Sequence, residues 1–329
     1  MENILVIRLK AIGDIVFTLP AIAALRERFP TAKITFLTSR ENAALLRGFA
    51  QVQGVMVLDR AALRSGNPLK VGAEFFGLLR RLRAGKFTHV VDFQGFGETA
   101  WMARLTGARE RWGSVYGKGR SWAYTHGLVR DDQLHPADWN LRLLAGCGVS
   151  ARAVQNEFVL PAEVLAAARR FFTDHALDVA RPSLVIQPFT STAQKNWPFE
   201  NFLAVARHWR AAGVQVIWVG GPAEAARMER ARAEQFCVAT NLPLLVSAGL
   251  VQLATLTLGG DTGLGHLGVA QGRRVLMLMM HKNPGACVPY QHPEWVVTPK
   301  TSRQIREIDV AEVIAEMGPL LGRDAGCLG

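Results

Sequence analysis

Short apolar runs alternate with segments of helical periodicity in the first half of the chain. Strands are predicted at residues 4–9, 33–38, 55–58 and 88–93, and helices at 15–28, 71–83 and 98–105. In the first of these helices Ile15, Ile22 and Leu25 fall on or near one face. Because strands that alternate with helices form parallel sheets covered on both faces, the pattern predicts a doubly wound domain.

The same alternation starts again after a helix at 161–175 and a breaker at Arg181-Pro182. It continues with strands at 183–187 and 214–219, helices at 199–211 and 224–235, and a last apolar run at 275–280. We therefore predict an α/β chain of two doubly wound, Rossmann-like domains, residues 1–160 and 161–329. Ligands of such sheets bind at the carboxyl ends of the strands. The loops at 10–14, 190–197 and 261–266 are therefore expected to line a cleft between the domains.

A glycine-rich turn at residues 260–268 lies where an apolar run ends and a short helix begins. Unpaired N–H groups and the positive end of the helix dipole make such a junction an anion site. The turn contains a literal GxGxxG, the fingerprint of dinucleotide-dependent oxidoreductases, but that fingerprint needs a carboxylate about 20 positions further on. The chain has Met280-His281-Lys282 at the end of the next strand. The hypothesis of a dinucleotide-dependent oxidoreductase is therefore weaker than that of a simple anion site.

Composition describes an ordinary globular protein: 329 residues, 49% hydrophobic and 20% charged. The 38 lysines and arginines exceed the 27 acidic residues, and the net charge of +11 favours anionic partners. The basic residues are scattered, without a basic tail or the aromatic pattern of an RNA-binding sheet, so we expect no nucleic-acid partner. The four cysteines form no CxxC and no pair with histidine, which suggests neither a zinc site nor a disulfide framework.

Several polar residues have both a structural and a functional reading. Asp14 stands where a helix begins and is either a cap or a general base. The hydroxyl-rich loop at 190–198, with the cation Lys195, suits a diphosphate or is an ordinary polar loop before a helix. Glu224 could hold a ribose or complement a helix dipole. His266 on a short helix is more often a packed or capped imidazole than a catalyst.

The combination of these motifs is more specific than any one of them. The run from Arg8 to Pro20, the loop at 190–198 and the turn at 261–267 occur in this order, and Asp92-Phe93-Gln94-Gly95 lies between the first two. Together they resemble the signatures of the bacterial heptosyltransferases, glycosyltransferase family 9, over nearly the whole chain.

The resemblance implies a GT-B fold with an N-terminal acceptor-binding domain and a C-terminal nucleotide-sugar-binding domain. It also implies inverting transfer of heptose from ADP-heptose to Kdo or heptose in the inner core of lipopolysaccharide. Carried over by position, the catalytic residues are Asp14, as general base, and Lys195. The donor-binding residues are Thr190, Ser191 and Lys195 at the diphosphate, Glu224 at the ribose, and Asp261, Thr262, Gly263 and His266 at the turn. Arg60, Lys118 and Arg120 are candidates for the acceptor side.

No cofactor and no metal are expected, because Lys195 and backbone N–H groups can stabilise the departing ADP. We expect a cytoplasmic protein, and we expect any contact with the inner membrane to be peripheral, since no stretch reaches the roughly 18 apolar residues of a membrane span. One departure concerns the donor: the family usually has a small Gly-Pro-Thr-like turn where this chain has residues 279–284. A same-fold transferase of another nucleotide sugar, or a non-catalytic nucleotide-binding protein, therefore stays open.

Overall fold

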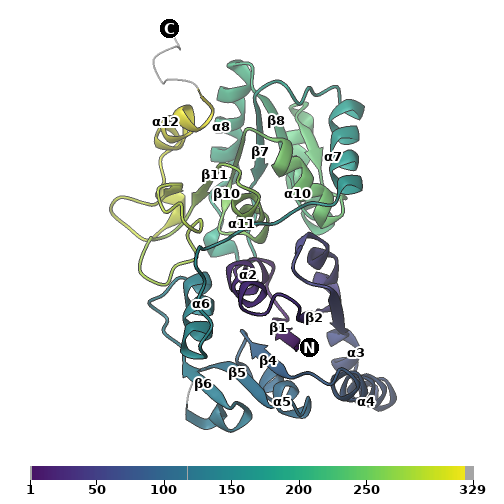
Figure 1. The fold of residues 1–329 in the computed structure, drawn as a ribbon. Coiled ribbons are helices and arrows are strands. Elements are labelled where there is room, and N and C mark those ends of the chain that lie inside the picture. The colour runs from purple at the N-terminus through teal and green to yellow at the C-terminus, as the bar shows by residue number, and fades with distance from the viewer. Residues whose placement is uncertain (1, 117, 323–329) are drawn as a thin grey trace. The chain divides into compact units, whose positions relative to one another are not determined.

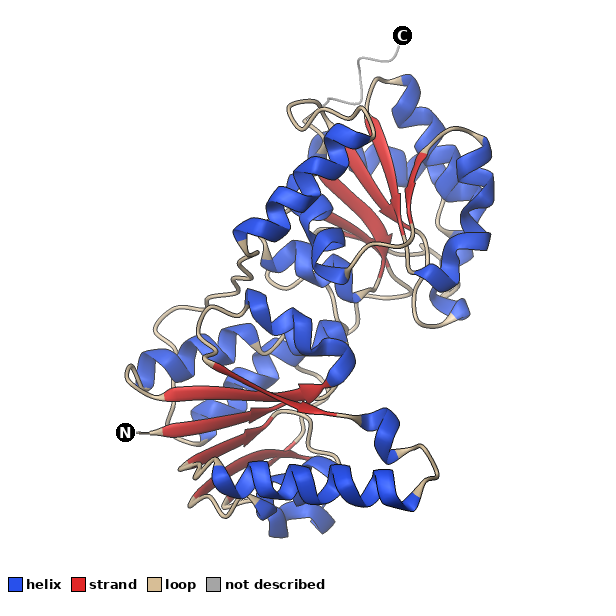
Figure 2. Ribbon diagram, turned by 90° about the vertical axis from the view of Figure 1, so that its right-hand side faces the viewer, coloured by secondary structure: helices blue, strands red, loops and turns tan. Residues whose placement is uncertain are grey.

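The computed structural model describes residues 2–116 and 118–322, apart from the side chain of Lys118. The chain divides into two compact units, Met1–Val159 and Leu160–Gly329, which we call unit 1 and unit 2. In each unit a parallel sheet is covered by helices on both faces (Figure 2). The predicted α/β class is therefore confirmed.

Unit 1 contains a sheet of six parallel strands in the order β3-β2-β1-β4-β5-β6 (Figure 1). The strands are β1 (Asn3–Ile7), β2 (Lys33–Ser39), β3 (Gly54–Leu58), β4 (His89–Asp92), β5 (Glu110–Val115) and β6 (His126–Val129). The α-helices are α1 (Ile12–Val16), α2 (Leu19–Arg28), α3 (Arg60–Leu63), α4 (Pro68–Ala84), α5 (Gly97–Leu105) and α6 (Pro136–Gly146). Two 3₁₀ segments are η1 (Arg40–Gly48) and η2 (Lys118–Ala123).

Unit 2 contains a second six-stranded parallel sheet, in the order β12-β11-β10-β7-β8-β9. The strands are β7 (Ser183–Gln187), β8 (Gln215–Val219), β9 (Cys237–Ala239), β10 (Leu256–Gly260), β11 (Val275–Leu278) and β12 (Val296–Val297). The α-helices are α7 (Ala162–Asp174), α8 (Phe199–Ala211), α9 (Glu229–Ala233), α10 (Leu244–Leu253), α11 (Gly263–Ala270) and α12 (Val310–Leu320). The 3₁₀ segments are η3 (Ala193–Lys195), η4 (Pro222–Met228) and η5 (Ile305–Glu307).

In both sheets the chain changes the direction in which it adds strands, and it does so after the third strand of each unit. The first three strands of each unit run outward to one edge, and the fourth strand returns beside the first, so that β4 pairs with β1 and β10 pairs with β7. At such a reversal the connections leave the two central strands in opposite directions, which opens a crevice at their carboxyl ends. These two switch points are where binding residues are expected.

The predicted helix at 15–28 is two helices, α1 and α2. Pro20 lies near the start of α2 and has no N–H group to donate to a carbonyl one turn earlier, so α1 cannot continue through it. The chain instead tightens, and Thr18 N–H donates to the carbonyl of Ile15 at 3.0 Å. The predicted helix at 224–235 is likewise a 3₁₀ segment, η4, followed by the short α9.

Aromatic side chains fill much of the core of unit 2. Trp218 on β8 and Phe202 on α8 are almost wholly buried, and so is Trp197 in the loop before α8. Each large apolar side chain of this kind stabilises the fold by about 1.5–3 kcal/mol relative to exposure. Among the helices that the structure describes, none is both long and apolar enough to cross a lipid bilayer.

Candidate functional site

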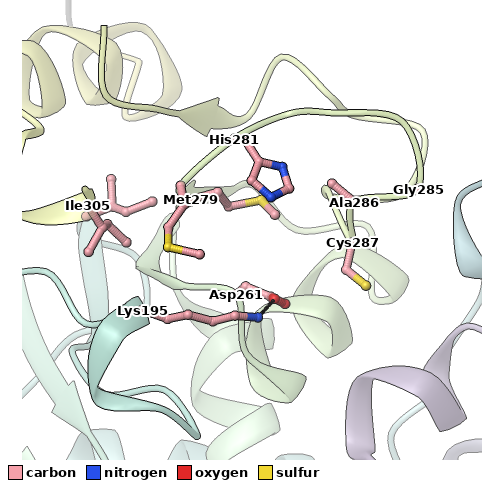
Figure 3. Close-up of a pocket in the computed structure, with 10 residues that line it drawn as sticks. Lys195, Asp261, Met279, His281, Gly285, Ala286, Cys287 and Ile305 are labelled. Atoms are coloured by element: carbon pink, nitrogen blue, oxygen red, sulfur yellow. Dashed lines mark hydrogen bonds and ion pairs between the residues drawn. The ribbon is translucent and has the colours of Figure 1, made fainter. Parts of the chain in front are cut away.

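In unit 2, three polar side chains meet at the carboxyl ends of β7 and β10. Lys195 lies at the end of η3 in the loop that follows β7, and Asp261 directly follows β10. The Nζ atom of Lys195 donates to Oδ2 of Asp261 at 2.8 Å (Figure 3). The Nε2 atom of His266, on α11, lies 3.1 Å from Oδ1 of the same carboxylate. One carboxylate therefore joins the loop after β7 to the helix after β10.

The two partners of Asp261 shift its pKa, and Asp261 in turn shifts the pKa of Lys195. Burial alone would raise the pKa of Asp261, but hydrogen bonds and charge from His266 and Lys195 outweigh it and bring the pKa to about 2. The hydrogen bond to Asp261 is also the main reason why the pKa of Lys195 is raised. Asp261 is therefore ionised near neutral pH, and its acceptor-only oxygens require that His266 carries its proton on Nε2.

The start of α11 is held against β7 by Thr262. Its Oγ1 atom accepts from the N–H of Gly265 at 3.2 Å, which caps the helix, and donates to Oε1 of Gln187 at 2.6 Å. The N–H groups of Gly263 and Leu264, in the first turn, have no intrahelical acceptor. They and the positive end of the helix dipole are groups that favour an anion, as the sequence predicted for this turn.

The glycines of the GxGxxG pattern all lie within α11, whereas the dinucleotide fingerprint uses its first glycine for the tight turn before the helix. Two of them allow close packing. A Cβ atom at Gly265 would lie 2.8 Å from the side chain of Met277, and one at Gly268 would lie 2.8 Å from Val251. The pattern thus has a packing explanation.

The loop between β7 and η3 is held by its own polar groups. Oδ1 of Asn196 accepts from the N–H of Thr190 at 2.7 Å and from its Oγ1 at 2.9 Å, while Ser191 is exposed. The loop approaches β10 so closely that a Cβ atom at Gly260 would lie 2.5 Å from Cγ2 of Thr190. The predicted diphosphate loop therefore lies against the predicted donor turn.

A pocket of about 200 Å³ opens beside this group. Lys195 and Asp261 line one side, and Met279, His281 and Cys287, from the segment after β11, line the other (Figure 3). Met279, His281 and Cys287 were not among the residues predicted for the site. The signal that could have found Met279 and His281 is the unusual run at 279–284, because it directly follows β11, the strand beside β10. Cys287 lies beyond this run.

Glu224 makes the contact expected if it complements a helix dipole. Its Oε2 atom accepts from the N–H of Gly221 at 2.8 Å at the start of η4, after β8. The carboxylate thus complements the positive end of this short helical segment. Its expected contact with a ribose stays a prediction.

In unit 1, Asp14 lies after β1 but is not the N-cap residue of its helix. Ala11 occupies that position, and Asp14 is three residues into α1. Its Oδ2 atom accepts from the N–H of Ala11 at 3.1 Å and from an Arg8 nitrogen at 2.6 Å. The side chain is 33% exposed. The capping reading was therefore wrong in position, although the carboxylate does close the first turn.

Arg8 connects the two central strands of unit 1. Its Nε atom donates to the carbonyl of Lys10 at 3.0 Å, and a terminal nitrogen donates to the carbonyl of Phe93, just after β4, at 2.8 Å. With the contact to Asp14, the guanidinium group makes hydrogen bonds to three different groups. Arg8 thus fixes Asp14 relative to the switch point of unit 1.

Asp92 ends β4 and is completely buried. Its Oδ1 atom accepts from the N–H groups of Gln94 and Gly95 at 2.9 and 3.0 Å, and its Oδ2 atom accepts from the hydroxyl of Tyr124 at 2.7 Å. Burial raises the pKa of Asp92 against the opposing effect of these donors. Because all its contacts are internal, Asp92 shapes the turn after β4 rather than facing a ligand.

The acceptor-side candidates have mixed surroundings. Arg60 is paired with Glu98 at 3.3 Å, and Arg120 donates to the carbonyl of Gly95 at 3.2 Å. The side chain of Lys118 lies outside the described residues. Within residues 2–116 and 118–322, no cluster of three or more His, Cys, Asp or Glu side chains could hold a metal ion. The expectation of a metal-free reaction stays a prediction.

A family model matches more than half of the chain. Residues 75–312 match the model of glycosyltransferase family 9 (heptosyltransferase). The lipopolysaccharide core heptosyltransferase OpsX of Haemophilus influenzae is 23% identical over 310 residues, which cover 90% of this chain and 84% of that protein.

Solved structures show the same fold. A family 9 glycosyltransferase from Veillonella parvula has a TM-score of 0.84 at 21% identity, covering 97% of each chain. The Escherichia coli heptosyltransferase WaaC with ADP has a TM-score of 0.79 at 21% identity, covering 97% of this chain and 99% of its own, and has also been solved with ADP-2-deoxy-2-fluoro heptose. The predicted GT-B type of fold is therefore confirmed.

Proposed function

The chain belongs to glycosyltransferase family 9, the heptosyltransferases, and we propose that it moves heptose from ADP-heptose to an inner-core sugar of lipopolysaccharide with inversion. It is a glycosyltransferase of lipopolysaccharide core assembly, as are its curated relatives. The main structural support for an ADP-sugar donor is the cluster of Lys195, Asp261 and His266 at the start of α11.

This cluster suits a nucleoside diphosphate. Lys195 and Asp261 line the pocket together, and α11, with the positive end of its helix dipole, begins two residues after Asp261. Asp261 holds Lys195 in place before the donor binds, which lowers the cost of ordering its long side chain. The WaaC structures with ADP and an ADP-heptose analogue support an ADP-sugar as the donor.

Asp14 is the proposed general base. Its two contacts use Oδ2, which leaves Oδ1 to take the proton of the acceptor hydroxyl. The deprotonated oxygen then forms a bond to the anomeric carbon of heptose. The bond between that carbon and the diphosphate oxygen breaks on the opposite side, and its electron pair leaves with ADP. A single displacement of this kind inverts the anomeric configuration.

Charge that develops on the departing diphosphate is stabilised by groups that are already in place. Lys195 supplies a full positive charge, and the N–H groups of Gly263 and Leu264 supply oriented dipoles. Thr190 and Ser191 are proposed to contact the phosphates, Glu224 the ribose, and the loop that carries His281 the base or sugar. No metal is needed for this assignment.

ADP release tests the proposal. Purified protein would be given ADP-heptose and a Kdo-bearing lipid A acceptor in the presence of a chelator, beside the variants Asp14→Asn and Lys195→Ala. We expect Asp14→Asn to abolish turnover while it binds ADP normally, because only the proton acceptor is lost. We expect Lys195→Ala to bind ADP at least about tenfold more weakly, because it loses a charge-assisted contact.

The exposed carboxylate Asp132 provides a matched control, and Asp132→Asn should behave like the wild type. Acceptor-dependent ADP release that persists in Asp14→Asn would remove this residue from the mechanism. If the wild type releases no nucleotide from ADP-heptose but is active with another nucleotide sugar, the protein is a same-fold transferase of that sugar. The unusual run at 279–284 would then be the first place to look for the difference in donor.

A further inference from the structure

Helices α4 and α5 of unit 1 lie side by side (Figure 1), and an apolar groove of about 460 Å³ runs between them. Phe75 and Leu79 line it from α4, and Trp101 and Leu105 line it from α5. Residues spaced three or four apart share one face of a helix. Each helix therefore turns a row of apolar side chains towards the groove.

Large apolar side chains are exposed on the same two helices, whereas Glu98 is the one charged residue among the described residues that line the groove. The side chains of Phe76 and Trp101 are 68% and 57% exposed, and Leu69 is more exposed still. Trp122, from η2, extends the patch: its ring packs edge-on against Trp101, with centroids 4.5 Å apart, and is itself half exposed. Exposed apolar side chains gathered on adjacent elements mark a surface that another molecule covers. We call these residues and the groove the α4–α5 surface.

Positive charge flanks the apolar residues. Along α4, Leu69, Phe76 and Arg80 are spaced seven and four residues apart, so they follow one exposed stripe of the helix. Lys70 and Arg83 are exposed on the same helix, whose one acidic residue, Glu74, is paired with Arg81 at 3.0 Å. The free charge of α4 is therefore positive.

We propose that the α4–α5 surface docks on an anionic lipid bilayer. Amphipathic helices with basic flanks lie in the bilayer interface, where their apolar side chains enter the acyl region and lysine and arginine meet phosphate headgroups. Tryptophan is favoured at the same depth. A second copy of the chain fits less well, because it would bring two basic helices together. Docking of this kind does not depend on which sugar the enzyme transfers.

Vesicle co-sedimentation tests the proposal on the full-length protein without donor or acceptor. Vesicles of phosphatidylcholine alone would be compared with vesicles that also contain phosphatidylglycerol. We expect the wild type to sediment with the anionic vesicles and to be released by salt. The double variants Phe76→Ser/Trp101→Ser and Lys70→Glu/Arg80→Glu should each lower the partition coefficient by about tenfold or more.

Matched controls lie on other elements. Val129→Ser replaces an exposed apolar residue on β6, and Arg169→Glu/Arg170→Glu reverses two exposed charges on α7, so both should sediment as the wild type does. Unchanged ADP affinity and circular dichroism show that each variant is folded.

Two results would overturn the proposal. One is a wild type that stays in solution with anionic vesicles at low salt, or that sediments equally well after Phe76→Ser/Trp101→Ser. The other is a dimer, seen by light scattering, that the same substitutions dissociate, since the surface would then bind a second copy. Neither result bears on sugar transfer, because the vesicles carry no acceptor sugar.

Discussion

Arg8 holds the proposed general base, Asp14, in its orientation. Three of its nitrogens are fixed, by Lys10, Phe93 and Asp14, and a lysine ammonium cannot reproduce this planar arrangement. We expect Arg8→Lys to lower kcat by about tenfold or more, because Asp14 loses its orientation. The ADP dissociation constant should not change, because the residues proposed to bind the donor belong to unit 2.

Steady-state kinetics with both substrates, together with ADP titration calorimetry, would measure this split. Arg64→Lys, at an exposed position before α4, is the matched control and should leave both quantities unchanged. A normal kcat in Arg8→Lys would show that Asp14 needs no partner, whereas lost ADP binding would point to general unfolding.

The ionised state of Asp261 makes stability depend on pH. Its pKa of about 2 in the folded protein lies below the ordinary value of 3.8, so the folded form favours the carboxylate. The resulting stabilisation, about 2 kcal/mol, is complete above pH 4 and is lost as the pH falls from about 4 to about 2. Asp261→Asn should therefore unfold more easily than the wild type at neutral pH, and the difference should shrink across this acidic range.

Urea unfolding at a series of pH values would measure the difference between the two proteins. Asp132→Asn serves as control, because its carboxylate is 78% exposed and should contribute little at any pH. A gap between wild type and Asp261→Asn that stayed constant down to the lowest pH would refute the ionic origin of the stabilisation.

At the residue scale the sequence located the site better than it described the contacts. The rule that ligands meet the carboxyl ends of parallel strands brought Lys195 and Asp261 to one place. Sequence could not show that they pair with each other, because 66 residues separate them along the chain. Met279 was predicted only as part of the apolar run at 275–280. His281 and Cys287 were missed because the loop after this run has no periodic pattern to interpret.

At the scale of elements, Gly260 sets how closely the loop after β7 approaches β10. A methyl group there would displace Thr190, and Thr190 cannot turn away without breaking its hydrogen bond to Asn196. We expect Gly260→Ala to destabilise the protein by about 1–3 kcal/mol and to weaken ADP binding, because it moves the diphosphate loop. Thermal unfolding with and without ADP would detect both effects.

Gly72 offers the opposite case for comparison. It lies inside α4 with nothing within 4 Å of an added Cβ atom, so Gly72→Ala should stabilise the protein by about 0.5–1 kcal/mol. Gly260→Ala with wild-type stability and ADP affinity would mean that the loop can shift at no cost.

Elements were predictable where one periodicity dominated. The apolar runs of β1, β2 and β7 and the amphipathic face of α8 were interpreted correctly because burial on the expected faces leaves a clear pattern. Helix α10 was not, because its sequence LLVSAGLVQL is apolar on nearly every side and hides the helical period. Strand β5 begins with Glu110 and Arg111, two charges that conceal it.

At the scale of the whole molecule, alternation was enough to predict two parallel sheets. Parallel neighbours need a crossover connection, so strands and helices in turn leave few other folds. The order of the strands could not be deduced in this way, since alternation does not say where the chain reverses. That reversal matters for function, because it brings Arg8 and Asp14 beside β4, and Asp261 beside the loop after β7.

The thiol of Cys287 opens the proposed donor pocket to covalent modification. Burial raises the pKa of Cys147 to about 12 and that of Cys237 to about 11, so both carry little reactive thiolate at neutral pH. Cys287 lines the pocket beside Lys195. A mild alkylating reagent should therefore modify Cys287 faster than these two, and ADP should slow the reaction, as peptide mass spectrometry can follow. An electrophile built on a nucleotide scaffold could then inactivate the enzyme by covalent capture rather than by affinity alone.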